Sequence, residues 1–333
     1  MVKGLTLRNI GILLLVFGLG SSVPGLTGCG QTYPKGKIKE SIIRVCKQEY
    51  KIDVKVTTVG KTIAIYLPLP NLLDFTFAIT KEAGEKINDV ILSVSRVALS
   101  TDAKYDFYCV IAHDVRIPEI QIVIIKSVDD VKRLLLNDIS RGEYSNRMLV
   151  DIRLNPQAQK EHSIKEVFEK MSLDKKWQDQ VMNDFFRSEP TGLGDIGYWN
   201  GRFYIKDIAR SEFLSEQIAS RIKLAFRDNR HMTENFILRS SKGIYVSKVA
   251  KRYFRFEVSA DYRIATQKSE EELAENVFRT VLDAASKVIH SYRFKDFDYI
   301  EIVNQGNAQT LQVSRDNLEA FRTKKIKFEA LLN

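Results

Sequence analysis

The sequence predicts an α+β protein made of two tandem two-layer sandwiches, each an antiparallel sheet with helices on one face, joined by a helical spacer. One order of elements (helix, strand, strand, long helix, strand, strand, helix, or αββαββα) occurs twice along the chain. The strands come in pairs joined by short turns, which indicates antiparallel pairing. The two long helices carry apolar stripes wide enough to cover a sheet.

The first copy of this order is expected over residues 37–152. Its long helix has an apolar stripe that contains Ile87, Val90 and Val94, which recur at helical spacing. The expected elements are, in order, a helix over 39–49, strands over 53–59 and 61–67 joined at Gly60, the long helix, a strand over 106–111, a further strand, and a helix that begins at Ser127.

The second copy is expected over residues 208–333. Its long helix carries the stripe of Val277, Val281 and Val288. The expected elements are, in order, a helix over 211–226, strands over 243–249 and 252–258, the long helix, a strand over 298–303, a further strand, and a helix that begins at Ser314.

Residues 153–207 are predicted to form a helical spacer followed by a loop rich in glycine and aromatic residues. Ser163 to Glu166 has the form of a capping box, which favours a helix start there. A second short helix is expected to carry Trp177 and to end before Pro190. Asn200 and Gly201, set between aromatic residues, predict a hairpin turn.

The first 28 residues have the layout of a secretory signal. Lys3 and Arg8 give a basic start, an apolar stretch runs over 10–19, and small and turn-forming residues follow. About ten apolar residues are too few for a span of the membrane, which needs roughly 20. Removal of this segment as a signal peptide is therefore favoured over an uncleaved apolar N-terminus.

The sequence Leu26-Thr27-Gly28-Cys29 resembles the lipobox of bacterial lipoproteins. The resemblance implies transfer of diacylglycerol to the sulfur of Cys29, cleavage before Cys29, acylation of the new amino terminus by chains such as palmitate, and a tether over residues 29–36. That tether spans at most ~28 Å at ~3.5 Å per residue. Gly30 lacks the acidic side chain of an inner-membrane retention cue, so an outer-membrane location, facing the periplasm, is implied if the host has two membranes. An ordinary secretory signal with an incidental Cys29 is the alternative.

Composition limits the class of partner. The formal charge of +9 includes Lys3 and Arg8, which leave with the signal, so the mature chain carries +7 in scattered positions. A moderately basic exported protein suits anionic lipids, an envelope protein or a cell-wall glycan, and nucleic acid is not expected. Beyond Cys29 only Cys46 and Cys109 remain, and either a disulfide or two buried thiols fits the sequence.

The loop at residues 192–204 holds the candidate ligand contacts. Gly192, Gly194 and Gly197 fit a G-x-G-x-x-G pattern, but no strand is expected before them and a hairpin follows, so nucleotide binding is not predicted. The aromatic residues of the hairpin could stack on a sugar or grip a peptide, and burial by packing is the alternative. These candidate contacts are Tyr198, Trp199, Arg202 and Tyr204.

No motif for catalysis, a cofactor or a metal can be assembled from the sequence. The four histidines are far apart, and His113-Asp114 is interpreted as a turn at the end of a strand. The sequence therefore favours a lipid-anchored envelope protein with a non-enzymatic binding or scaffolding role. The alternatives are a carrier that holds a small or lipid-like ligand between the two repeats and, less favoured, an enzyme acting on envelope polymers.

Overall fold

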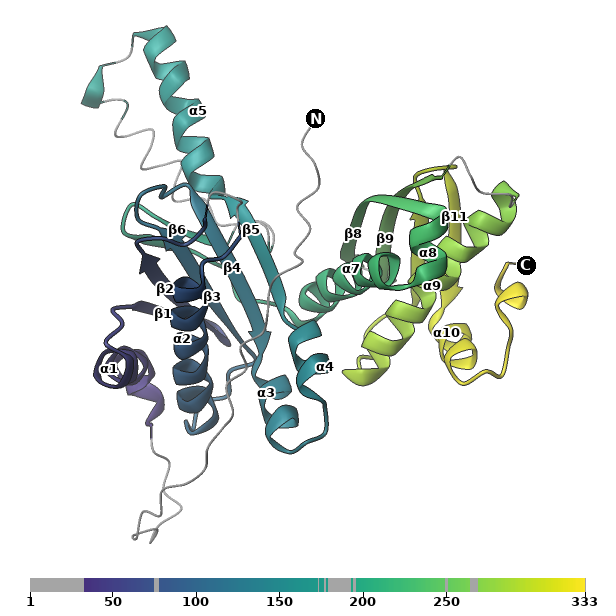
Figure 1. Cartoon of the computed structure of the whole chain (residues 1–333), viewed down its shortest axis with the longest axis horizontal. Helices are drawn as coiled ribbons and strands as arrows, with labels where there is room; N and C mark the ends of the chain where they lie inside the picture. Colours follow the sequence, from purple (N-terminus) through teal and green to yellow (C-terminus); the bar gives the residue numbers. More distant parts are fainter. Residues whose placement is uncertain are drawn as a thin grey trace, which may run out of the picture. The chain divides into compact units, whose positions relative to one another are not determined.

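The computed structural model describes residues 33–74, 78–172, 174–176, 178, 193, 196–248, 251–263 and 269–332. Over these ranges the chain is a mixed α+β protein, as predicted, and it divides into two compact units between Ile208 and Ala209 (Figure 1). The signal segment and Cys29 lie outside the described residues. In the described part, no helix has both the length and the apolar character needed to cross a membrane.

Unit 1 is built on a five-stranded sheet with the strand order β1-β2-β3-β4-β5. Its strands are β1 (Lys55–Val59), β2 (Thr62–Leu69), β3 (Phe107–Asp114), β4 (Ile120–Ser127) and β5 (Leu149–Leu154). Its helices are the short 3-10 helix η1 (Lys35–Lys37), α1 (Ile38–Tyr50), α2 (Lys81–Leu99), α3 (Val128–Leu135), α4 (Arg141–Asn146) and α5 (Pro156–Met171). The order α1-β1-β2-α2-β3-β4-α3 is the predicted one.

The sheet of unit 1 is mixed rather than wholly antiparallel. β1 pairs with β2, and β3 with β4, in antiparallel fashion, but β2 and β3 are parallel. The connection through α2 explains this difference, because it returns the chain to the end of the sheet where β2 began. The short turns therefore predict only the pairing within each hairpin.

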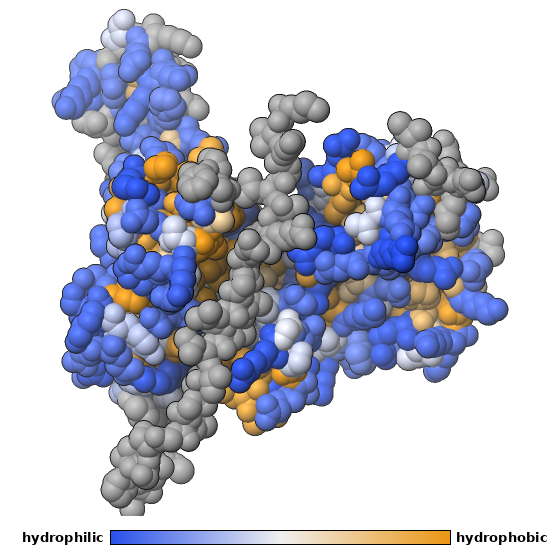
Figure 2. Space-filling view, viewed as in Figure 1, coloured by the Kyte–Doolittle hydropathy of each residue, from blue (hydrophilic) through white to orange (hydrophobic). Residues whose placement is uncertain are grey.

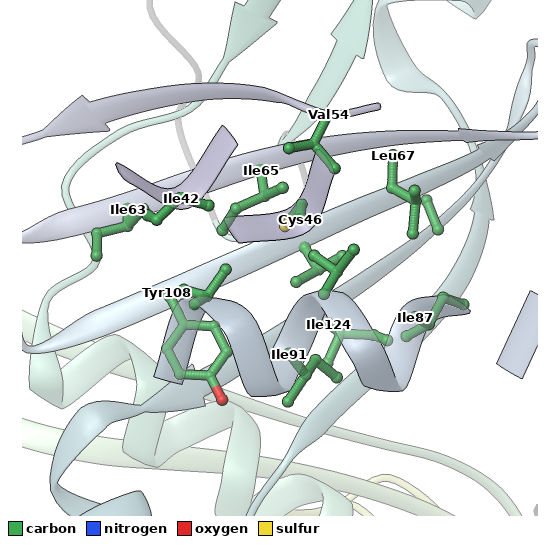
Figure 3. Packing of buried hydrophobic residues seen from close by; sticks show 14 of the residues in the cluster. Ile42, Cys46, Val54, Ile63, Ile65, Leu67, Ile87, Ile91, Tyr108 and Ile124 are labelled. Carbon is green, nitrogen blue, oxygen red and sulfur yellow. The ribbon is translucent and has the colours of Figure 1, made fainter. Parts of the chain in front are cut away.

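Helices α1 and α2 cover one face of this sheet. Figure 3 shows Ile42 and Cys46 of α1 and Ile87 and Ile91 of α2 among the buried strand side chains of the same cluster. Side chains in a strand alternate between faces, so every second residue of β2, β3 and β4 meets the helices. The strand residues of this core are Ile63, Ile65, Leu67, Leu69, Tyr108, Val110, Ala112, Ile122 and Ile124.

The segment after the first repeat differs from its prediction. β5, α4 and the start of α5 were not expected. Asn155, not Ser163, begins the helix: its side chain accepts hydrogen bonds from the N–H groups of Gln157 and Ala158. Pro156 suits the first helical position because its missing N–H would have had no helical partner. The expected second spacer helix falls almost entirely outside the described residues.

Unit 2 has a four-stranded sheet with the order β11-β10-β9-β8. It repeats the pairing of β1 to β4: the first two and the last two strands are antiparallel, and the middle pair is parallel, joined by a long helix. Its elements are α7 (Arg210–Asp228), α8 (Arg230–Asn235), β8 (Phe236–Lys248), β9 (Lys251–Tyr262), α9 (Glu270–Ser291), β10 (Tyr299–Asn304), β11 (Gln309–Ser314), α10 (Arg315–Arg322) and the 3-10 helix η3 (Phe328–Leu331).

Helix α7 approaches the sheet of unit 2 closely at Gly243. A Cβ atom at this position would lie 2.2 Å from the backbone oxygen of Ser215 on α7. Only glycine allows this contact between helix and strand. β8 begins at Phe236, seven residues before the predicted start at Gly243, and α8 precedes it. The remaining strands alternate between buried and more exposed residues, so one sheet face packs on helices.

Candidate functional site

The predicted hairpin forms and belongs to unit 1. Its strands are β6 (Gly197–Trp199) and β7 (Arg202–Tyr204), and they pair in antiparallel fashion. Asn200 and Gly201 both have positive φ, 46° and 82°, as a two-residue hairpin turn requires. Of the glycine pattern that precedes it, Gly192 and Gly194 lie outside the described residues, whereas Gly197 begins β6.

The hairpin packs on the sheet face opposite α1 and α2. Tyr198 is buried, with 6% of its surface exposed, and its ring stacks on Tyr66 of β2 with the two centroids 3.7 Å apart. The ring of His113 of β3 also stacks on Tyr66, with the two centroids 4.8 Å apart. Unit 1 thus has a third layer, and the stack Tyr198-Tyr66-His113 (the aromatic stack) lies within it.

Two polar side chains hold the backbone of Tyr198. The amide of Gln121 accepts from its N–H at 3.2 Å and donates to its carbonyl at 2.5 Å, much as a neighbouring strand would. Asn155, which caps α5, donates to the same carbonyl at 3.1 Å. The position of the hairpin is therefore fixed by the sheet and by the start of α5.

The other candidate contacts have different surroundings. Tyr204 is buried, and the indole N–H of Trp199 donates to Glu161 on α5, which also accepts from the side chain of Asn200 at 2.9 Å. Arg202 is exposed. The structure thus brings Tyr198, Trp199 and Tyr204 into packing contacts of unit 1 and leaves Arg202 at its surface.

His113 is a buried histidine with an orphaned nitrogen. Its Nε2 lies 3.1 Å from the hydroxyl of Tyr66, while its Nδ1 is buried and has no hydrogen-bond partner. Burial lowers the pKa of His113, against the opposing effect of the adjacent Asp114. Burial also raises the pKa of Tyr66 to about 12.

The hydroxyl of Tyr198, at the other side of the aromatic stack, has a charged partner. The ammonium of Lys55 donates a hydrogen bond to it at 2.7 Å.

Asp114 has a structural role at the end of β3. The carboxylate accepts from the backbone N–H of Leu72 and of Arg116, each at 2.9 Å. Burial acts to raise the pKa of Asp114, but these hydrogen bonds outweigh it and leave the pKa below its ordinary value. His113 and Asp114 are thus the last residues of a strand rather than part of a turn.

A second buried polar cluster, which the sequence did not reveal, lies at the other end of β4. The Nζ of Lys126 is 3.9 Å from the ring centroid of Tyr144, and Asp130 accepts a hydrogen bond from Arg147 at 2.8 Å. Burial lowers the pKa of Lys126 to about 7, although Asp130 acts in the opposite direction. Alternation with Ile122 and Ile124 was the one available signal that Lys126 faces the core.

The two remaining cysteines are both buried and form no disulfide. Cys46 of α1 lies in the core between the helices and the sheet. Cys109 of β3 has core residues on either side of it in the sequence and so faces the opposite side of the sheet. The sheet therefore separates the two thiols.

The sheet of unit 2 presents a different kind of face away from its helices. Tyr253 and Tyr299 stack there with centroids 4.6 Å apart and ring planes 10° from parallel. Beside them Arg255 forms ion pairs with Glu257 at 3.1 Å and with Glu301 at 3.3 Å. Gln312 donates to Glu301 at 3.0 Å. This polar and aromatic surface is named the open face below.

Over the described ranges, no three His, Cys, Asp or Glu side chains gather as a metal ion would require. The chain matches no known protein family, no curated protein and no solved structure.

Proposed function

We propose that this chain is a lipid-anchored protein of the cell envelope that binds a partner without catalysing a reaction. The sequence Leu26-Thr27-Gly28-Cys29 supports the anchor, since it resembles a lipobox and follows a signal-like segment. The partner would be another envelope protein or a cell-wall glycan. The open face of unit 2 is the observation that carries the binding role.

Strands β1 to β4 of unit 1 and the four strands of unit 2 share one order, but the two sheets have different outer faces. In unit 1 every residue of β3 is buried, and the hairpin β6–β7 packs on the outer face. In unit 2 the residues of β9 and β10 alternate, and those of the outer face are partly exposed. Tyrosine and arginine are enriched where proteins bind one another, and tyrosine rings also pack on sugars. A rigid sheet that presents them suits a binding surface.

The anchor is tested by the intact mass of the protein purified from host membranes. A chain that begins at Cys29 and carries added acyl mass is the expected result. The Cys29→Ser variant should lack that mass and leave the membrane fraction. A wild-type chain that retains Met1, or that begins elsewhere without lipid, would contradict the anchor.

The binding role is tested by a photo-crosslinking amino acid placed in the full chain in host cells. Position Gln312, exposed beside Glu301 of the open face, should give a discrete crosslinked product. Exposed Lys287, on α9, is the matched control and should give none. Tyr299→Ala should weaken the product at position 312. Equal crosslinking at both positions, or none at 312, counts against a binding surface here.

A further inference from the structure

Two adjacent leucines at the end of α3 are exposed to solvent. Leu135 is 59% exposed and Leu136 is 79% exposed, the highest values of any large hydrophobic side chain in the described ranges. Figure 2 shows hydrophobic surface over the turn between α3 and α4. We call residues 135–136 the leucine turn. An exposed apolar pair of this kind lowers solubility unless a partner covers it.

The leucine turn lies at the end of unit 1 where the chain enters from the tether. Tyr33, the first described residue, forms a bridge with Thr101, and the N–H of Lys35 donates to Asp102 at 2.6 Å. A few residues later, the carbonyl of Asp106 accepts from the N–H of Val128, the first residue of α3. In Figure 1, η1 and the turn between α3 and α4 both lie at the lower end of unit 1.

Exposed cations lie near the leucine turn in the sequence and at the point of entry. Lys132 on α3 and Arg141 on α4 flank the two leucines, and the exposed carboxylates of Asp129 and Asp138 also occur in this segment. The same end of unit 1 carries three further exposed lysines. They are Lys35, Lys37 and Lys104. Exposed cations near an apolar tip favour contact with a membrane that contains anionic lipids.

We infer that the leucine turn inserts into the headgroup region of the membrane that holds Cys29, with the exposed cations of this end of unit 1 on anionic lipid headgroups. This inference rests on the proposed lipid anchor. Only four residue steps separate Cys29 from Tyr33, the first residue that contacts unit 1, so this part of the tether spans at most ~14 Å. A folded domain of about 100 residues has a radius of gyration of about 13 Å, so it is roughly 34 Å across. The tether thus brings this end to the bilayer and leaves too little room for a protein partner between them.

The test uses the processed, acylated protein with a polarity-sensitive dye on a cysteine at position 136. Leu136→Cys is the reporter, and Leu154→Cys is the matched control, because Leu154 is 53% exposed but ends β5 at the opposite end of the sheet. On vesicles of phosphatidylcholine and phosphatidylglycerol, the dye at 136 should brighten several-fold and be quenched by nitroxide-labelled lipid. The dye at 154 should not respond.

The outcomes separate the inference from the proposed function. If the protein floats with the vesicles but the dye at 136 stays dim, the inference fails and the anchor stands. If the protein has no acyl mass and does not float, the anchor fails and the inference fails with it. Equal responses at 136 and 154, or a response at 136 that needs added envelope protein, would also overturn insertion of this turn.

A second variant checks the energetic role of the leucine turn. Replacing both leucines by serine (L135S/L136S) should speed transfer of the acylated protein between vesicles several-fold, because less apolar surface is held in the membrane. Leu154→Ser should leave the transfer rate unchanged. An unchanged rate for the double variant would show that the turn does not enter the bilayer.

Discussion

Tyr198 stacks on Tyr66 with 3.7 Å between the ring centroids, so a hairpin late in unit 1 completes a sheet whose strands come much earlier in the chain. The contact closes the face that α1 and α2 leave uncovered. The four strands of unit 2 have the order of β1 to β4, but no such hairpin covers their open face among the described elements. This difference between two similar sheets underlies the assignment of the binding role to unit 2.

Tyr198→Ala should lower the free energy of unfolding by about 3–5 kcal/mol, because it removes a buried ring and leaves a cavity beside Tyr66. Tyr198→Phe keeps the stack and loses the hydrogen bond from Lys55, so it should cost about 1 kcal/mol. Denaturant titration measures both values. Arg202→Ala, an exposed change in the same hairpin, should stay within about 0.5 kcal/mol of the wild type. Equal effects of the changes at 198 and 202 would contradict the role of the stack.

Unit 1 should lose stability in mild acid because of His113. Burial lowers the pKa of this histidine in the folded state below its ordinary value of 6.5. The unfolded chain then binds more protons than the folded chain as the pH falls, so the free energy of unfolding decreases from about pH 6.5 downward, until the folded histidine also titrates. The titratable groups next to the ring are Asp114, which opposes the shift, and Tyr66, whose hydroxyl lies 3.1 Å from Nε2. Tyr198 and Lys55 lie further off, because Tyr198 stacks on Tyr66 and Lys55 donates to the hydroxyl of Tyr198.

His113→Gln should flatten this pH dependence, as measured by denaturant titrations between pH 5 and 8. His290→Gln replaces an exposed histidine of unit 2 and serves as the control. The control should keep the slope of the wild type. If His113→Gln kept that slope as well, the acid sensitivity would come from other groups.

The sequence predicted the repeated order of elements because hydrophobic periodicity is a local signal. It did not predict the first part of β8, where a register shift between Leu238 and Ser240 interrupts the alternation. The hairpin turn at Asn200-Gly201 was predictable, since both positions need positive φ. The partners of Tyr198 were not, because they depend on which sheet face the helices leave free. Lys126 was missed because the sequence does not reveal that Tyr144 and Asp130 lie beside it.

Lys126→Met should not lower the free energy of unfolding at pH 7. It should remove the rise in that free energy which the wild type shows at alkaline pH. The folded pKa of about 7 lies below the ordinary value of 10.5, so charging the buried amine opposes folding at low pH. In the wild type the free energy of unfolding should therefore rise between pH 7 and 9, where only the unfolded chain keeps the proton. Methionine has a similar volume and no charge, so the variant should lack this rise.

The measurement for Lys126 is the unfolding midpoint in denaturant at pH 7, 8 and 9. Lys132→Met, an exposed change on α3, is the control and should follow the wild type. A large loss of stability in Lys126→Met at pH 7 would mean that the contact of the ammonium with the ring of Tyr144 outweighs the cost of burial.

Gly243→Ala should move α7 away from β8 and destabilise unit 2. The added Cβ would lie 2.2 Å from the carbonyl oxygen of Ser215, and a backbone atom can yield only if the whole helix shifts. Overpacking of this kind costs about 1–3 kcal/mol. Hydrogen exchange should therefore accelerate at the amides of α7 and β8, while the amides of unit 1 keep their rates. Gly36→Ala, which adds a methyl group with no atom within 4 Å, should change neither unit. Unchanged exchange in Gly243→Ala would show that the close packing of α7 on β8 is not needed for the stability of the sheet.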